Sequence, residues 1–219
     1  MFADRDEAGR ELAHHLTLLR DQAPVVLALP RGGVPVAARI AEALNAPLDL
    51  MLVRKIGVPG HRELAVGAIA GPDGQTMVTN PDVAAMARLD ARTIAQLADV
   101  ERAELRRRQA LYLKGRPPLD LAGKTVILVD DGIATGATAK AALQTLRSAG
   151  PKRIVLAVPV ASTEAVAALK ALADEIICLA IPPMFDAVGT HYRSFPQVED
   201  AEVIDTLASH GLRTIPPQA

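Results

Sequence analysis

The chain has 219 residues, of which 50% are hydrophobic and 22% are charged, and its formal net charge is −1. This composition excludes intrinsic disorder as the overall state, because such a chain can bury a substantial core. The nearly balanced charge gives no global electrostatic reason to bind nucleic acid or anionic lipid. The single cysteine argues against an internal disulfide and against a cysteine-built zinc site. With no signal-peptide pattern and no apolar run of about 18 residues, we expect a cytoplasmic protein that does not enter the membrane.

A helix is predicted at 4–20, because Leu12, Leu16 and Leu19 recur at helical spacing. The rest of the chain alternates between strands and helices. Continuous apolar runs, typical of strands that are buried on both faces, occupy 25–29, 48–53, 125–129, 153–159 and 175–181, and helices are expected at about 34–44, 136–149 and 163–172. This alternation predicts an α/β fold, a doubly wound, mainly parallel five-stranded sheet with helices on both faces.

Two insertions interrupt the alternation of what we interpret as one domain over 1–219. Residues 55–80 are rich in glycine and predict a flexible arm or β-hairpin around Pro72-Asp73-Gly74. Residues 82–114 predict a helical insertion. Its basic run 106–108 suggests a nucleic-acid patch or a solvated helix face supported by a Glu104–Arg108 pair, and the solvated face is favoured.

The most informative segment is 126–138, where a buried strand ends in Asp130 and Asp131 and a Gly- and Thr-rich loop leads into a helix. Free N–H groups at a helix start, together with the helix macrodipole, form a phosphate cradle. Carboxylates beside such a cradle would repel a bound anion unless they bind another part of the same ligand. The two hydroxyls of a ribose could donate hydrogen bonds to them. A 5-phosphorylated ribose therefore fits this segment.

This segment also resembles the signature of type I phosphoribosyltransferases: four apolar residues, two acidic residues, three variable ones and then Thr-Gly-x-Thr. The resemblance implies that Asp130 and Asp131 hold the ribose of phosphoribosyl pyrophosphate and act as the catalytic carboxylates. It assigns the 5-phosphate to the loop 134–138. The residues of that loop are Ala134, Thr135, Gly136, Ala137 and Thr138.

A second anion loop, Arg31-Gly32-Gly33, follows the strand at 25–29. Ligands of open α/β sheets bind beyond the carboxyl ends of strands at the reversal of strand order, so the two loops share a crevice if their strands flank that reversal. In the family this loop binds pyrophosphate, often with a cis peptide, which here would be Pro30–Arg31. Arg54 and Lys55 are further candidates for pyrophosphate or, alternatively, a solvated strand end. The arm around His61, Arg62 and Glu63 occupies the place of the family's loop that closes over the site.

The resemblance implies transfer of a 5-phosphoribosyl group from phosphoribosyl pyrophosphate to a nitrogenous base or amine, with release of pyrophosphate. Mg²⁺ is expected to bind through the substrate's phosphates and hydroxyls, with no direct protein ligand. The alternative is a non-catalytic regulatory protein that binds the donor or a nucleotide. Homodimers are common in the family, and the resemblance brings one as an expectation.

The acceptor is expected to contact a C-terminal hood at 182–199, where Phe185 and Tyr192 are candidates for stacking on a planar ring. The alternative is that these aromatic residues cover the sheet edge or a dimer contact. Ala134 stands where 6-oxopurine enzymes of the family commonly have an aspartate, which counts against hypoxanthine or guanine. The chain is most similar to an uncharacterised bacterial branch of the family, which brings no established acceptor.

Overall fold

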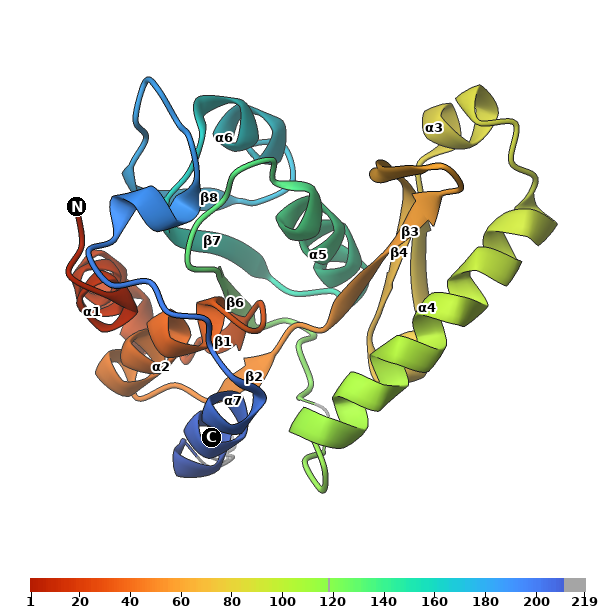
Figure 1. Cartoon of the computed structure of the whole chain (residues 1–219). Helices are drawn as coiled ribbons and strands as arrows, with labels where there is room; N and C mark the ends of the chain where they lie inside the picture. The colour runs from red at the N-terminus through yellow and green to blue at the C-terminus, as the bar shows by residue number, and fades with distance from the viewer. Residues whose placement is uncertain (118, 211–219) are drawn as a thin grey trace.

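A five-stranded parallel sheet runs through the centre of the molecule in the order β2-β1-β6-β7-β8 (Figure 1). The computed structural model describes residues 1–117 and 119–210, and the side chains of residues 62, 63 and 72 lie outside its description. The strands of this sheet are β1 Val25–Ala28, β2 Leu48–Leu50, β6 Thr125–Val129, β7 Arg153–Val160 and β8 Glu175–Ala180. The predicted doubly wound α/β fold is confirmed.

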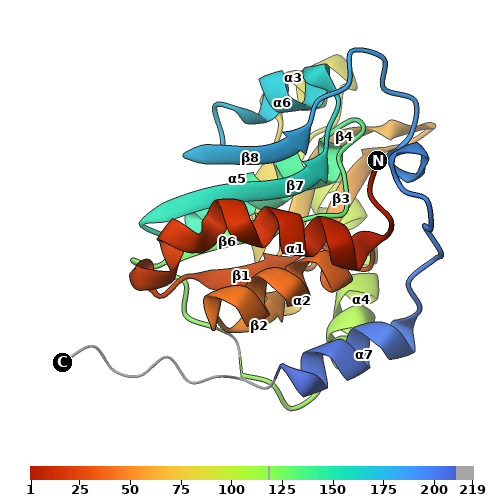
Figure 2. The ribbon, with the colours of Figure 1, turned by 90° about the vertical axis from the view of Figure 1, so that its left-hand side faces the viewer.

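Side chains of the central strands alternate between two apolar cores. Val26 and Ile127 belong to the core beneath α1 and α2, whereas Leu27 and Leu128 belong to the core beneath α5 and α6. Figure 2 shows α1 and α2 in front of the sheet and α5 behind it. The bounds of these helices are α1 Arg5–Leu16, α2 Gly33–Leu44, α5 Ala137–Ser148 and α6 Thr163–Leu169. Short 3-10 helices follow at Thr17–Gln22, Pro72–Gly74 and Val188–His191.

The strand predicted at 48–53 is wrong in its second half. Strand β2 ends at Leu50, where the N–H of Met51 still bonds to the carbonyl of Ala28 at 2.9 Å. The chain then leaves the parallel sheet, and Val53 begins β3, whose partner is β4. Lys55 was predicted at the end of a strand of the parallel sheet. It lies instead in β3, which belongs to the antiparallel sheet.

The glycine-rich arm is a three-stranded antiparallel sheet in the order β3-β4-β5. Its strands are β3 Val53–Val58, β4 His61–Ala70 and β5 Thr76–Thr79. The turn around Pro72-Asp73-Gly74 joins β4 to β5, as predicted for a hairpin, and a second hairpin joins β3 to β4. In Figure 1 this sheet lies between α4 and α5.

The insertion at 82–114 contains two helices instead of one. They are α3 Pro81–Met86 and α4 Ala91–Tyr112, each capped by the side chain of the residue before it, Asn80 or Asp90. Arg88 has a φ of 52°, which ends the first helix before the second begins. Ile94, Ala98 and Leu105 form the buried stripe of α4.

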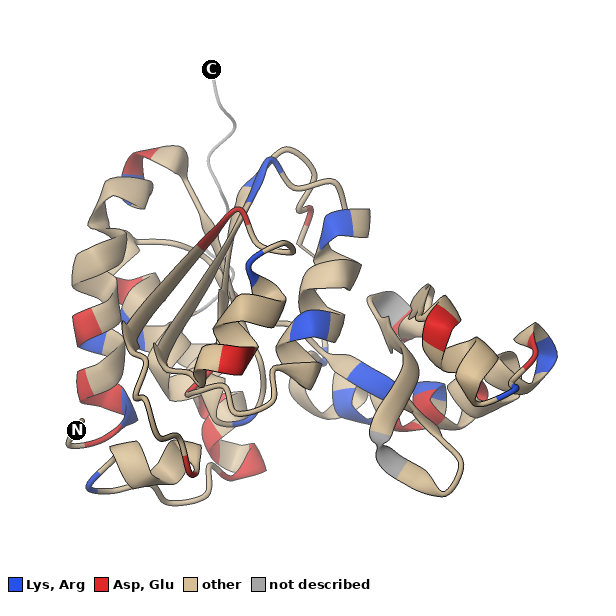
Figure 3. Ribbon diagram, turned by 90° about the horizontal axis from the view of Figure 1, so that it is seen from above, with Lys and Arg blue, Asp and Glu red and all other residues tan. Residues whose placement is uncertain are grey.

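A last helix, α7 Asp200–Ser209, follows the hood and packs on α2 through buried Val203 and Leu207. It was not predicted. Figure 3 shows basic and acidic residues intermixed along the helices of the molecule. Among the described residues, no helix has both the length and the apolar character that a membrane crossing requires.

Candidate functional site

Strands β1 and β6 are neighbours, and the order of strands reverses between them. Ala28 pairs with Val129 at their carboxyl ends, and the N–H of Leu29 bonds to the carbonyl of Val129 at 2.8 Å. The loops that follow the two strands therefore start side by side, at the switch point where open α/β sheets bind ligands. The condition under which the two loops share one crevice is therefore met.

The loop after β1 contacts the acid pair so closely that only glycine fits. A Cβ added to Gly32 would lie 2.0 Å from Oδ2 of Asp131, and one added to Gly33 would lie 2.7 Å from the carbonyl oxygen of Val129. The peptide bond Pro30–Arg31 is cis. The predicted pyrophosphate loop and the predicted ribose carboxylates are thus brought together at one edge.

Asp130 and Asp131 are two adjacent, largely buried carboxylates. Burial and the charge of Asp131 raise the pKa of Asp130 well above its ordinary value. Burial also raises the pKa of Asp131, while the nearby guanidinium of Arg5 opposes that rise. Oδ1 of Asp130 accepts the N–H of Asp131 at 2.9 Å. The fold thus concentrates negative charge in a poorly solvated place, which costs stability unless a ligand or a cation compensates it.

The predicted phosphate loop connects β6 to the N-terminus of α5. The first N–H groups of a helix have no partner within the helix and so can bind an anion. Gly136, the residue before the helix, has a φ of 74°, which only glycine adopts without strain. Ser162 anchors the loop by donating its hydroxyl to the carbonyl of Ala134 at 2.7 Å. Ala134, Thr135 and Thr138 are exposed, so these three residues of the loop are open to solvent.

Arg5 is a site residue that sequence reasoning missed. Its Nε donates to Oδ2 of Asp131 at 2.8 Å, its Nη1 donates to the carbonyl of Pro196 at 2.7 Å, and its guanidinium lies 3.7 Å from the centre of the Phe195 ring. The spacing of residues in the sequence could have indicated that Arg5 is buried, because Arg5 lies on the buried stripe of α1 with Ala8 and Leu12. A single arginine on an apolar stripe indicates a buried partner, although the sequence does not say which one.

The two aromatic candidates of the hood occupy different places. Tyr192 is 6% exposed between Phe2 and Phe195, with ring centres 5.5 and 4.8 Å away, and its hydroxyl donates to the carbonyl of Asp131 at 2.6 Å. In this arrangement its ring supports the acid pair and has no free face for an acceptor. Phe185 is half-buried and stacks on His191 at 5.5 Å.

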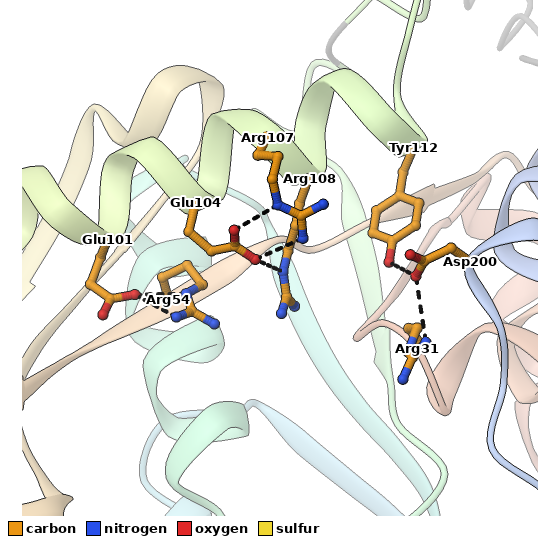
Figure 4. Close-up of polar contacts among 8 residues, drawn as sticks. All are labelled: Arg31, Arg54, Glu101, Glu104, Arg107, Arg108, Tyr112 and Asp200. Atoms are coloured by element: carbon orange, nitrogen blue, oxygen red, sulfur yellow. Dashed lines mark hydrogen bonds and ion pairs between the residues drawn. The ribbon is translucent and has the colours of Figure 1, made fainter.

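Arg31 is held by the start of α7. Its Nη1 lies 3.5 Å from Oδ1 of Asp200 and 3.8 Å from Oε2 of Glu199, and Asp200 also accepts the hydroxyl of Tyr112 (Figure 4). These contacts connect the loop 31–33 to α4 and α7. A cavity of about 370 Å³ opens beside Arg31. Its other lining residues are Arg5, Gly32, Asp131, Phe195, Pro196, Gln197 and Val198.

Arg54 and Lys55 point to opposite faces of the arm, because neighbouring residues of a strand alternate. Arg54 forms an ion pair of 2.7 Å with Glu101 on α4 (Figure 4). Lys55, on the other face, is half-buried and has no ion pair or side-chain hydrogen bond with the described residues. The side chains of Arg62 and Glu63 lie outside the described residues. Closure of this part of the arm over the site therefore stays a prediction.

The strand order defines a doubly wound α/β protein. The acid pair and the two glycine-containing loops put its candidate ligand site at the reversal of strand order. The chain belongs to the phosphoribosyl transferase family, since the family model described as "Phosphoribosyl transferase domain" matches residues 6–189.

Among solved structures, the chain is similar to TT1426 from Thermus thermophilus, with 45% identity, a TM-score of 0.87 and coverage of 95% of this chain and 98% of that one. It is also 50% identical, over 204 residues, to a Mycobacterium tuberculosis protein named "Putative phosphoribosyl transferase". The match covers 93% of this chain and 46% of that protein, so the chain spans about half the length of this curated relative. A further relative, "Bifunctional protein PyrR" of Chloroflexus aurantiacus, is 34% identical over 131 residues, which are 58% of this chain and 65% of that one.

Proposed function

We propose that this protein transfers the 5-phosphoribosyl group of phosphoribosyl pyrophosphate to a nitrogenous base or amine. The observation that carries the proposal is the close approach of Gly32 to Asp131, which joins an anion loop and a carboxylate pair in one site. Phosphoribosyl pyrophosphate carries the matching groups: phosphates for the anion loops and a ribose diol for the carboxylates. Membership of the phosphoribosyl transferase family supports it.

Each part of the donor has a proposed partner. Asp130 and Asp131 accept hydrogen bonds from the ribose hydroxyls, and the loop 134–138 donates its N–H groups and threonine hydroxyls to the 5-phosphate. Arg31, Gly32 and Gly33 bind the pyrophosphate, and Lys55 is the further candidate for it. In the reaction the bond from C1 to the pyrophosphate oxygen breaks with its electron pair, and a nitrogen of the acceptor forms the new bond to C1 and gives up its proton.

The residues of the site position the reactants and compensate charge, and no covalent intermediate with the protein is needed. Positive charge that develops on the sugar lies beside the two carboxylates, which stabilise it. Arg31 compensates the negative charge of the leaving pyrophosphate. A buried acid pair of raised pKa therefore has a use in the transition state that it lacks in the free protein.

Mg²⁺ fits this site as a partner of the donor. Among the described residues, no three His, Cys, Asp or Glu side chains are grouped as ligands for a metal ion. Oxygen donors suit Mg²⁺, and it commonly reaches proteins through the phosphates of a substrate. The donor's own phosphate and hydroxyl oxygens are the proposed ligands, and the ion would neutralise the pyrophosphate as it leaves.

The acceptor belongs, in this proposal, in the cavity of about 370 Å³ beside Arg31. That volume lies in the range of small-molecule sites. Because Tyr192 is buried, Phe185 is the hood candidate whose side chain is still partly open to solvent, although it does not line this cavity. The cytoplasmic location predicted from the sequence stays part of this proposal.

A regulatory protein that binds the donor without turnover is the second candidate. The ion pair of Arg31 with Asp200 and Glu199 must open for the donor's pyrophosphate to bind in either candidate, so the two differ only in turnover. The match to the bifunctional protein PyrR is compatible with either function.

The test is calorimetric titration with phosphoribosyl pyrophosphate and Mg²⁺, followed by a screen of purine, pyrimidine and amine acceptors for release of pyrophosphate. Binding together with turnover on one acceptor is the expected result. Binding with no turnover on any acceptor selects the regulatory protein. Absence of binding would contradict both candidates.

A further inference from the structure

The basic run 106–108 on α4 is not one uniform solvated face. Arg107 is 61% exposed and Arg108 is 32% exposed, although both donate hydrogen bonds to the same carboxylate of Glu104. Figure 4 shows the Arg108 side chain extending from α4 toward the core, past Glu104. The two neighbouring arginines therefore differ in direction and in burial.

Arg108 reaches from α4 to the edge of the candidate site. It lines a cavity of about 20 Å³ with Pro30, which precedes the pyrophosphate loop, and with Thr138, which ends the phosphate loop. A cavity of that size holds about one water molecule and no phosphate group. It nevertheless shows that one side chain of the insertion lies beside the last residue of the loop 134–138 and the residue that precedes the loop 31–33.

The hydrogen bonds of Arg108 leave most of its donors free. Arg107 binds Glu104 through two nitrogens, at 2.7 and 3.0 Å, whereas Arg108 uses only Nε, at 2.9 Å. Neither terminal nitrogen of Arg108 has a hydrogen bond with any residue that the structure describes. A guanidinium with two free donors beside two anion loops has the geometry for a phosphate oxygen.

Glu104 does not cancel this charge. Its two arginine partners lower its pKa to about 2, so it is ionised near neutral pH and supplies one negative charge against two positive ones. The pair of Arg107 with Glu104 is the more complete of the two. One net positive charge therefore remains on the side of the cluster that faces the site.

We infer that Arg108 is a phosphate-binding residue, which α4 contributes to the donor site between the loops 31–33 and 134–138. This inference rests on the proposed function, since it adds a cation to the proposed donor site. The helical insertion then has a direct part in ligand binding. The ligand chemistry is a phosphate group, which the 5-phosphate or the pyrophosphate of the donor can supply.

The experiment measures the Kd of phosphoribosyl pyrophosphate, ribose 5-phosphate and pyrophosphate, by calorimetry at fixed ionic strength, for Arg108→Gln and Arg107→Gln. The two variants change the net charge equally and remove a partner of the same Glu104, so Arg107→Gln is the matched control. We expect Arg108→Gln to weaken binding of the donor about tenfold, while Arg107→Gln stays within about twofold. Weakened binding of ribose 5-phosphate assigns Arg108 to the 5-phosphate, and weakened binding of pyrophosphate assigns it to the leaving group.

Glu104→Gln provides a change in the opposite direction, because it removes the carboxylate that competes for Arg108. We expect the donor to bind about twofold to fivefold more tightly to that variant. Equal losses for Arg107→Gln and Arg108→Gln, or no loss for either, overturn the inference and leave the proposed function intact. If the wild-type protein binds pyrophosphate in a manner that depends on Arg108 but does not bind the donor, the proposed function fails and the phosphate role of Arg108 stands.

Discussion

Nε of Arg5 lies 2.8 Å from Oδ2 of Asp131, and the two side chains are only 9% and 13% exposed. The pair connects the N-terminal helix to the segment that follows β6. Because the guanidinium also contacts Phe195 and the carbonyl of Pro196, it joins the hood to the acid pair. The orientation of the proposed ribose carboxylate thus depends on residues from three distant parts of the sequence.

Arg5→Met is expected to destabilise the protein by roughly 3–5 kcal/mol at pH 7, because it leaves a buried carboxylate without its cation. The loss shrinks as the pH falls, since Asp131, whose pKa is already raised, then takes up a proton in the folded state. Urea denaturation at pH 7 and pH 5 measures both effects.

The control for that variant is Arg10→Met, which removes an exposed pair with Asp6 on the same helix and should cost less than about 0.5 kcal/mol. The double variant Arg5→Met with Asp131→Asn should recover most of the lost stability. Equal losses of stability for Arg5→Met and Arg10→Met would show that the buried ion pair stabilises the protein no more than an exposed one.

Asp130→Asn is expected to stabilise the ligand-free protein. A carboxyl whose pKa is raised on folding lowers stability above its ordinary pKa, so its neutral analogue removes that cost at pH 7. The thermal midpoint should rise by roughly 2–4 °C, the shift that about 1 kcal/mol produces in a chain of this size. The gain should shrink as the pH falls and vanish below the ordinary value of 3.8, where Asp130 is protonated in the folded and the unfolded state. A lower midpoint at pH 7 would contradict the electrostatic description of the pair.

Gly32→Ala is expected to weaken donor binding at least about tenfold and to cost about 1–3 kcal/mol, because its Cβ would overlap Oδ2 of Asp131. Gly57→Ala on the arm is the matched variant, since nothing lies within 4 Å of its added Cβ. Calorimetry with phosphoribosyl pyrophosphate compares the two. A donor affinity that Gly32→Ala leaves unchanged would separate Asp131 from the binding site.

Asp200→Asn is expected to tighten pyrophosphate binding about twofold to fivefold, because the ion pair that holds Arg31 in the free protein is weakened. The hydroxyl of Tyr112 keeps an oxygen to donate to. Asp205→Asn, an exposed residue of the same helix without an ion pair to the described residues, changes the net charge equally and should leave the affinity unchanged. Identical effects of the two variants would indicate a general charge effect.

Most of the central sheet could be predicted from the sequence, because strands buried on both faces appear as continuous apolar runs. The run at 125–129 matches β6 in both bounds. The prediction failed where a short run continues into another sheet, as at Leu50, since hydrophobicity alone does not report the pairing partner.

The candidate site also has parts that the sequence predicts and parts that it does not. The two loops and the acid pair are local patterns, so Asp131 and Gly32 could be found from their neighbours in the chain. Arg5 and Asp200 reach the site only through tertiary packing, across 126 residues in the pair of Arg5 with Asp131. No local pattern encodes such contacts. For the same reason the sequence left two interpretations of Tyr192 open, stacking on an acceptor or covering the protein's own structure, and its burial favours the second.

The most direct test of the account is a crystal structure of the protein with phosphoribosyl pyrophosphate and Mg²⁺. We predict the 5-phosphate within hydrogen-bond distance of the N–H groups of 134–138, and the ribose hydroxyls on Asp130 and Asp131. A donor whose 5-phosphate lies away from the start of α5 would contradict the account.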